Sequence, residues 1–361
     1  MRRFTTATLA LTFAATGALT GAAVVAAQDG SDLKIGLVTD VGTINDRNFN
    51  QFSWEGTQAG AEDVGAPEPQ YAISQASADI APNIQAFVDQ GYDIVVTVGN
   101  AASDDTLAAA EASPDTWFVG VDQAPPEGVE NYIGLQWLED QPGYLAGVVA
   151  ASISETGHVA AVGGTAVIPA VVNYIEGYAN GARSVNPDAE VVVAYVSEAP
   201  DAAAFADPAG GTTFTQQLLA QDPEIDVMFQ VAGLTGNGVL QAACDAGIYA
   251  IGVDVDQYLS APETSQCTVT SAEKKLKDSV NKAIIGIASG NPGADGTPAV
   301  GANVLGIDTQ DVGLAPFHEF EDLISDETRE AIAAAEAGLA DGSLTACEQD
   351  ETTGYCVQTL P

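Results

Sequence analysis

The sequence predicts an α/β fold built from two doubly wound, Rossmann-like lobes with parallel sheets. Apolar runs rich in Val and Ile alternate along the chain with longer stretches of helical character. These runs are continuous rather than alternating apolar and polar, which is typical of strands buried on both faces of a parallel sheet. About 330 residues follow an N-terminal leader, more than one compact core usually holds, so two lobes are expected.

The individual elements can be assigned in order along the chain. The expected strands are residues 34–39, 93–98, 117–121, 159–162, 191–196, 226–231 and 249–253. The expected helices are residues 47–61, 80–90, 101–112, 142–153, 171–185, 214–220, 238–246 and 272–289. In the last of these helices one apolar stripe recurs at helical spacing, formed by Leu276, Val280, Ala283, Ile284 and Ile287. Repeated right-handed βαβ units then give two doubly wound lobes.

The two lobes are expected to be joined by a hinge of three strands. The predicted crossings lie near residues 132–137, near 254–257 and in the Gly/Pro-rich stretch 291–303. The first lobe would then hold residues 33–135 plus 256–290, and the second 136–254 plus 300–340. Residues 341–361 form a C-terminal tail.

The first 27 residues have the pattern of an export signal. Arg2 and Arg3 precede an Ala-rich apolar stretch (8–25), and a small-residue cleavage site ends at Ala27. The triplet 19–21 resembles the start of a lipobox, but Ala22 stands where the lipidated Cys would be. We therefore expect a soluble periplasmic protein without a lipid anchor.

The charge of the chain excludes some partners. Fifty acidic residues stand against ten basic ones, for a net charge of −40 at pH 7. Such a chain repels nucleic acid and anionic lipid surfaces. The excess of acidic residues is interpreted as a solubility adaptation. Cation binding is disfavoured because the sequence contains no cluster of metal-ligating residues with a fixed spacing.

Four cysteines follow the leader, and an even number in an oxidising compartment indicates two disulfides with three possible pairings. Local spacing favours Cys347–Cys356, which closes a small loop, and Cys244–Cys267, which ties a helix to a nearby strand. A metal site is disfavoured because no pair has C-x-x-C spacing and the histidines, His158 and His318, lie far away in sequence.

The segment 33–56, LKIGLVTDVGTINDRNFNQFSWEG, carries the strongest functional signal. A strand runs into a polar loop and then into a helix rich in aromatics, and ligands of open α/β sheets bind at such strand ends. The stretch from Asp40 to Gly56 resembles the opening motif of the basic membrane protein family, which are purine nucleoside receptors of ABC importers.

The resemblance continues in the family's order along the chain. It includes GYDIVVTVGN (91–100), FVGVDQ (118–123), FQVAGLTGNGV (229–239), IGVDVDQ (251–257) and TVTSAEK (268–274). It implies the fold of a type I periplasmic binding protein over residues 33–340, with no cofactor. It also implies a monomer that captures a nucleoside, with a purine nucleoside expected, between its lobes and delivers it to an ABC permease.

The resemblance implies the site residues as well. Trp54 and Phe229 match the family's stacking positions, and base stacking contributes about 1–3 kcal/mol per face. Lys274 is expected on the first turn of a helix as a donor to ligand oxygens. The full expected set is Asp40, Asn45, Asp46, Trp54, Asp122, Phe229, Gly233, Gly252, Asp254 and Lys274.

The remaining members of this set suit a nucleoside chemically. Asn45 can donate to and accept from a purine edge, while Asp46 and Asp122 accept from N–H groups. Asp254 would accept from ribose hydroxyls. Gly233 and Gly252 let backbone N–H groups approach the ligand closely.

Several of these residues also have a purely structural interpretation. Trp54 and Phe229 could be core side chains, and Phe49 and Phe52 are taken as core. Asp46 could cap the following helix. Lys274 could belong to a solvated face with its neighbouring lysines.

Other function classes fit the sequence less well. The Gly-rich stretch 233–238 has the wrong spacing for a dinucleotide site, and no P-loop motif occurs. A nucleophile elbow is also absent, as is the N-terminal aspartate signature of nucleoside hydrolases, so an enzyme is not expected. The open alternative is a type I binding protein for a sugar or another small solute.

Overall fold

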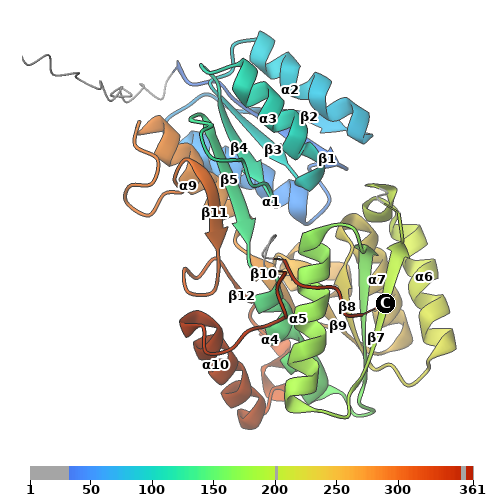
Figure 1. Ribbon diagram of the computed structural model, residues 1–361. Coiled ribbons are helices and arrows are strands. Elements are labelled where there is room, and N and C mark those ends of the chain that lie inside the picture. Colours follow the sequence, from blue (N-terminus) through green and yellow to red (C-terminus); the bar gives the residue numbers. More distant parts are fainter. Residues whose placement is uncertain (1–31, 200–201, 351–354, 361) are drawn as a thin grey trace, which may run out of the picture.

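The computed structural model describes residues 32–199, 202–350 and 355–360. They form two lobes, one above the other in Figure 1, each built on a six-stranded sheet covered by helices. The export signal expected at residues 1–27 lies outside the described residues. Among the residues that are described, no helix has the length and apolar character needed to cross a membrane.

The first sheet has the strand order β11-β5-β4-β3-β1-β2, and all its neighbouring strands are parallel. Its strands are β1 (Ile35–Val41), β2 (Gln70–Ser74), β3 (Ile94–Val98), β4 (Trp117–Val121), β5 (Tyr132–Trp137) and β11 (Gly301–Leu305). The covering helices are α1 (Phe49–Asp63), α2 (Ile80–Asp89), α3 (Ser103–Ala112) and α9 (Leu276–Ala288).

The second sheet has the order β12-β10-β9-β8-β6-β7, parallel except for the β10–β12 pair. Its strands are β6 (His158–Thr165), β7 (Glu190–Ser197), β8 (Val227–Val231), β9 (Tyr249–Asp254), β10 (Thr268–Lys274) and β12 (Val312–Leu314). Its helices are α4 (Asp140–Ile153), α5 (Pro169–Val185), α6 (Pro208–Gln221), α7 (Gly233–Ala246), α8 (Gln257–Ser260) and α10 (Asp326–Asp341).

The predicted fold class is confirmed, because each lobe is a doubly wound sheet with buried parallel strands. β3 illustrates the reason: all five of its residues are buried, as the continuous apolar run at 93–98 indicated. The seven expected strands all correspond to observed strands. β2, β5, β10, β11 and β12 were not assigned from the sequence as strands, although residues 132–137 of β5 were expected as a crossing between the lobes.

The segment 268–274 corrects one expectation about Lys274. Lys274 does not lie on a helix but is the last residue of β10, where it pairs with Val312 of β12. The helix expected from 272 begins at Leu276. Ala, Glu and Lys favour helices in isolation, yet pairing of β10 with strands on both sides overrides that preference.

Two of the three predicted crossings, and the lobe boundaries drawn from them, also need correction. The first crossing follows β5 as expected, but the second lies between β10 and α9, and the third between β11 and β12. β10, expected in the first lobe, belongs to the second sheet, whereas β11, expected in the second lobe, pairs with β5 of the first. The second crossing was misplaced because the end of β10 was expected to be the start of a helix.

The contact between α1 and α9 explains part of the N-terminal sequence motif. A Cβ on Gly56 would lie 2.6 Å from the carbonyl oxygen of Lys277, and one on Gly60 would lie 2.8 Å from Ile284. The apolar stripe of α9 packs here, and Ile284 is fully buried. Gly56 therefore permits close helix packing.

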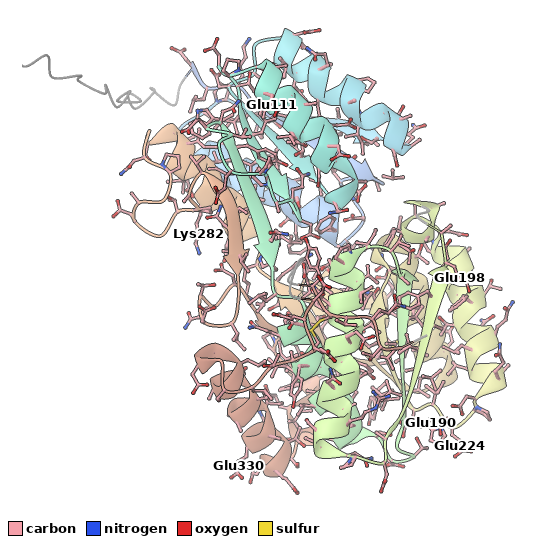
Figure 2. All side chains as sticks on the ribbon, viewed as in Figure 1. Glu111, Glu190, Glu198, Glu224, Lys282 and Glu330 are labelled. Carbon is pink, nitrogen blue, oxygen red and sulfur yellow. A yellow bond between two sulfur atoms is a disulfide. The ribbon has the colours of Figure 1, made fainter. Side chains whose placement is uncertain are left out.

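Two disulfides, Cys244–Cys267 and Cys347–Cys356, are present as the local spacing favoured. The surface around this core is strongly acidic. Figure 2 labels Glu111 on the first lobe and Glu190, Glu198, Glu224 and Glu330 on the second, all of them exposed.

Candidate functional site

A cavity of about 290 Å³ lies between the two lobes, at the carboxyl ends of their strands. The first lobe contributes the ends of β1, β3 and β4 and the start of α1, and the second contributes the ends of β8, β9 and β10 and the start of α5. Of the ten expected site residues, the cavity is lined by Asp40, Asp46, Asp122, Gly233, Asp254 and Lys274.

Lys274 is the centre of a charge cluster on the cavity wall. Its Nζ donates to both carboxylate oxygens of Asp122, at 2.7 and 2.9 Å. It also lies 3.5 Å from an oxygen of Glu139 and 3.7 Å from one of Asp254. Since Asp122 directly follows β4 of the first lobe and Lys274 ends β10 of the second, this ion pair joins the two lobes.

Burial and mutual repulsion control the protonation of this cluster. Burial raises the pKa of Glu139 to about 7, against the opposing effect of Lys274, and the pKa of Asp254 to about 6. Burial lowers the pKa of Lys274, but the carboxylates of Asp122, Asp254 and Glu139 outweigh it, so that pKa is raised. Lys274 therefore stays charged, and its charge is shared among its partners.

Asp122 and Asp254 occupy equivalent places in the two lobes. Each follows or ends a central strand, and each has a left-handed backbone with φ of 56° and 65° respectively. Non-glycine residues rarely adopt this conformation, which costs on the order of 1–3 kcal/mol and is concentrated at functional sites. Both residues line the interlobe cavity.

The end of β1 and the loop after it supply two more carboxylates, Asp40 and Asp46. Asp46 caps α1, because its side chain accepts hydrogen bonds from the backbone N–H groups of Asn48, Asn50 and Gln51 at 2.9–3.0 Å. It nevertheless lines the cavity, so capping and exposure to a ligand coexist. Burial raises the pKa of Asp40 to about 6 and also raises that of Asp46.

The two aromatic residues expected to stack on the ligand are core residues in this structure. Trp54 is 8% exposed, packs among the core side chains of the first lobe and makes an edge contact with Tyr71. Phe229 is fully buried and stacks on Tyr178 at a centroid distance of 5.1 Å. Neither lines the cavity, because both side chains point into the hydrophobic layer between sheet and helices.

The aromatic residues that do line the cavity are Phe49, Tyr174 and Phe205. The ring of Phe49 lies 4.9 Å from Nζ of Lys274, and the hydroxyl of Tyr174 donates to Asp254 at 3.3 Å. From the sequence, Phe49 was expected in the core, and Tyr174 and Phe205 were not expected at the site. Phe49 could have been found, because it begins the helix that follows Asp46.

Asn45 and Gly252 are likewise outside the cavity lining. A Cβ on Gly252 would lie 2.4 Å from Oγ of Ser271, so this glycine serves strand packing. Gly233 lines the cavity at the start of α7, with φ of 54°.

The lobes are also in contact through other residues. Arg47 forms an ion pair with Glu263, and the side-chain amide of Asn237 donates to the carbonyl oxygen of Asp46 at 3.2 Å. Together with the Lys274–Asp122 pair, these contacts describe a conformation in which the lobes are closed upon each other.

Metal-ligating side chains gather in two other places within the described residues. One group, Asp140 with Cys347 and Cys356, has both sulfurs in a disulfide. The other, His158 with Glu190 and Asp222, lies at the start of β6, the end of the sheet opposite the cavity. Neither group belongs to the cavity lining.

Comparison with known proteins gives one family match. The sequence model of the family "ABC transporter substrate-binding protein PnrA-like" matches residues 34–337. The ABC transporter nucleoside-binding protein BmpA of Lactococcus lactis is 28% identical, covering 87% of this chain and 89% of that protein. Basic membrane protein A of Borreliella burgdorferi is 27% identical, with coverages of 70% and 71%.

Solved structures show the same fold. A solute-binding protein of an ABC transporter system from Aeropyrum pernix superposes with a TM-score of 0.76 at 22% identity, covering 87% of this chain and 92% of that one. A glucose-galactose binding protein from Geobacillus stearothermophilus has a TM-score of 0.58 at 12% identity, with coverages of 80% and 99%.

Proposed function

We propose that the solute captured in the interlobe cavity is a nucleoside, on the premise that this chain belongs to the PnrA-like family of ABC transporter substrate-binding proteins. Proteins of this family bind a small ligand outside the cytoplasm for their transporter and are not enzymes as a class. What remains to be proposed is the identity of the ligand and how the site holds it.

The chemistry of the cavity supports a neutral ligand rich in hydrogen-bond donors. Asp40, Asp46, Asp122 and Asp254 all offer acceptor oxygens, while Lys274 is already paired with carboxylates. A phosphate or carboxylate ligand would meet this excess of negative charge and is disfavoured. Ribose hydroxyls and purine N–H groups are donors that such oxygens accept.

The apolar part of the cavity supports a flat ring. Phe49 and Phe205 approach from different lobes, together with aliphatic side chains of Val167, Val171 and Val231. Stacking on an aromatic side chain contributes about 1–3 kcal/mol per base and tolerates different bases. The single observation that carries the proposal is this pairing of aromatic walls with two carboxylates at equivalent strand ends, Asp122 and Asp254.

The proposed mechanism is capture by lobe closure. A ligand that bridges both lobes stabilises the closed form in proportion to its differential affinity for that form. The closed protein, a periplasmic monomer after removal of its signal, then docks on the permease and releases the ligand there. The relative from Lactococcus lactis, described as nucleoside-binding, is consistent with this ligand class.

A thermal-shift screen tests the proposal. The mature protein is heated with purine and pyrimidine nucleosides, free bases, ribose, arabinose, glucose and nucleoside monophosphates. A ligand at a hundredfold excess over its dissociation constant adds about 2.7 kcal/mol, so a raised melting temperature is expected with purine nucleosides. A shift with sugars but not nucleosides would make this chain a sugar-binding protein.

A further inference from the structure

The C-terminal tail that follows α10 lies beyond the part of the chain that the family model matches, and the structure describes its residues 343–350 and 355–360. The described part leaves α10 and crosses α5 of the second lobe, as the dark red ribbon in Figure 1 shows. The disulfide Cys347–Cys356 holds it in a loop and is packed against Val172 of α5. The tail is thus a docked part of the fold.

One face of α5 is polar and forms hydrogen bonds with the tail. Asn173, Glu176 and Asn180 are spaced so that they share a face of the helix. The carboxylate of Glu176, 2% exposed, accepts from the backbone N–H and hydroxyl of Thr359 and from the N–H of Leu360, at 2.6–3.0 Å. Buried polar groups cost stability unless paired, so this face requires the tail.

A line of hydrogen bonds runs from the tail to the ligand cavity. The backbone N–H of Cys356 donates to Oδ1 of Asn173 at 2.9 Å, and the amide of Asn173 donates to Glu139 at 3.2 Å. The other oxygen of Glu139 lies 3.5 Å from Nζ of Lys274, which holds Asp122. The tail therefore fixes the side chains directly behind the charge cluster.

Tyr355 connects the tail to the other lobe. Its hydroxyl accepts a hydrogen bond of 2.8 Å from the side-chain amide of Gln136, which lies on β5 of the first sheet. Tyr355 also closes a small cavity of about 20 Å³ whose wall shares Asp122 and Asn100 with the ligand cavity. The contact thus spans the lobes next to the first crossing of the hinge.

We propose that the disulfide-closed tail is a brace across the hinge, in which Tyr355 and Asn173 are positioning residues that favour lobe closure and raise ligand affinity. A contact between lobes that is made in the closed form shifts the equilibrium toward that form. Loss of the contact lowers the fraction of molecules in the closed form, and the apparent ligand affinity falls in proportion to that fraction. A structural role confined to the second lobe would change stability without this loss of affinity.

The first experiment compares the two disulfides. The variants Cys347→Ser/Cys356→Ser and Cys244→Ser/Cys267→Ser are titrated calorimetrically with the nucleoside that most raises the melting temperature of the wild type. The control disulfide closes the longer loop, 23 against 9 residues, and its removal should cost more stability. We expect affinity to fall about tenfold in the tail variant and to stay within about twofold in the control. Equal affinity losses, or none in the tail variant, would overturn the brace.

The second experiment removes one oxygen and does not depend on the tail variant folding. Tyr355→Phe should weaken binding about two- to tenfold, the worth of one hydrogen bond. In a double-mutant cycle, the same change should have no further effect in a Gln136→Ala background. Additive effects would show that the tyrosine does not act through Gln136 and would overturn the bridging role.

The third experiment separates the brace from the identity of the ligand. The affinity measurements rest on the proposed nucleoside function, whereas small-angle scattering of the unliganded protein does not. The brace predicts a larger radius of gyration for Tyr355→Phe and for the tail disulfide variant than for the wild type and the control disulfide variant. Identical values would overturn the brace. A wild type that binds no nucleoside would instead contradict the proposed function.

Discussion

Replacement of Asp122 by Asn tests the role of the interlobe ion pair in ligand capture. The carboxylate of Asp122 takes two charge-assisted hydrogen bonds from Lys274, at 2.7 and 2.9 Å, and its side chain is 13% exposed. Asn is nearly isosteric and tolerates the left-handed backbone at φ 56°, so the substitution removes charge with little strain.

The expected loss follows from the geometry. A hydrogen bond to a charged group contributes about 1.5–3 kcal/mol. Because Asp122 and Lys274 belong to different lobes, this loss falls on closure and hence on ligand binding. Asp122→Asn should therefore raise the dissociation constant for the best nucleoside by about 10- to 150-fold.

Isothermal titration calorimetry measures this effect, with Asp295→Asn as the matched control. Asp295 also has a left-handed backbone, at φ 52°, but is exposed and is not among the residues that line the cavity. The control should bind as the wild type does. An Asp122→Asn protein that binds within twofold of the wild type would refute the reasoning, because the ion pair would then contribute nothing to closure.

Three further predictions concern other parts of the molecule. Phe49→Ala should weaken nucleoside binding by about 1–3 kcal/mol, whereas Phe52→Ala on the same helix should lower the melting temperature and leave calorimetric affinity unchanged. In the folded state the pKa is raised to about 6 for Asp254 and to about 7 for Glu139. At a pH between the ordinary carboxyl pKa and these raised values, the folded state therefore binds more protons than the unfolded state. Stability should thus fall as pH rises through this window, and Glu139→Gln should flatten the dependence of melting temperature on pH; an unchanged slope would contradict the assignment to Glu139. Gly56→Ala should cost about 1–3 kcal/mol in urea denaturation by forcing α1 from α9, whereas Gly313→Ala, with no described atom within 4 Å of the new Cβ, should cost much less.

Sequence patterns were sufficient for the fold because the buried strands are nearly continuous runs of Val and Ile. β3 and β8 are buried over their whole length, so each run defines its strand without reference to partners. β10 and β11 depend on context. The end of β10 contains helix-favouring residues, and it becomes a strand because β9 and β12 pair with it.

Sequence patterns indicated cavity-lining residues where a charged side chain stands at a strand end, but not where the orientation of an aromatic side chain decides whether it lines the cavity. Asp122, Asp254 and Lys274 stand at strand ends, and topology alone brings such ends to one cleft. For aromatics on a helix or strand, the deciding variable is the face on which the side chain lies. Trp54 and Phe229 face the core, whereas Phe49 faces the cavity, and a single sequence does not fix that rotation.

The tail could not be related to the site from sequence at all. Asn173 and Glu176 lie in an apolar helical stretch, and their partners in the tail are 183 or 184 residues away. Burial of these polar side chains is visible only once the tail is docked on α5.

The most direct test of the account is a crystal structure of the mature protein with the nucleoside that binds it best. We predict that the nucleoside occupies the interlobe cavity, with its base against Phe49 or Phe205 and its ribose hydroxyls within hydrogen-bond distance of Asp122 or Asp254. A nucleoside bound outside this cavity, or a cavity filled by a different class of solute, would contradict the account.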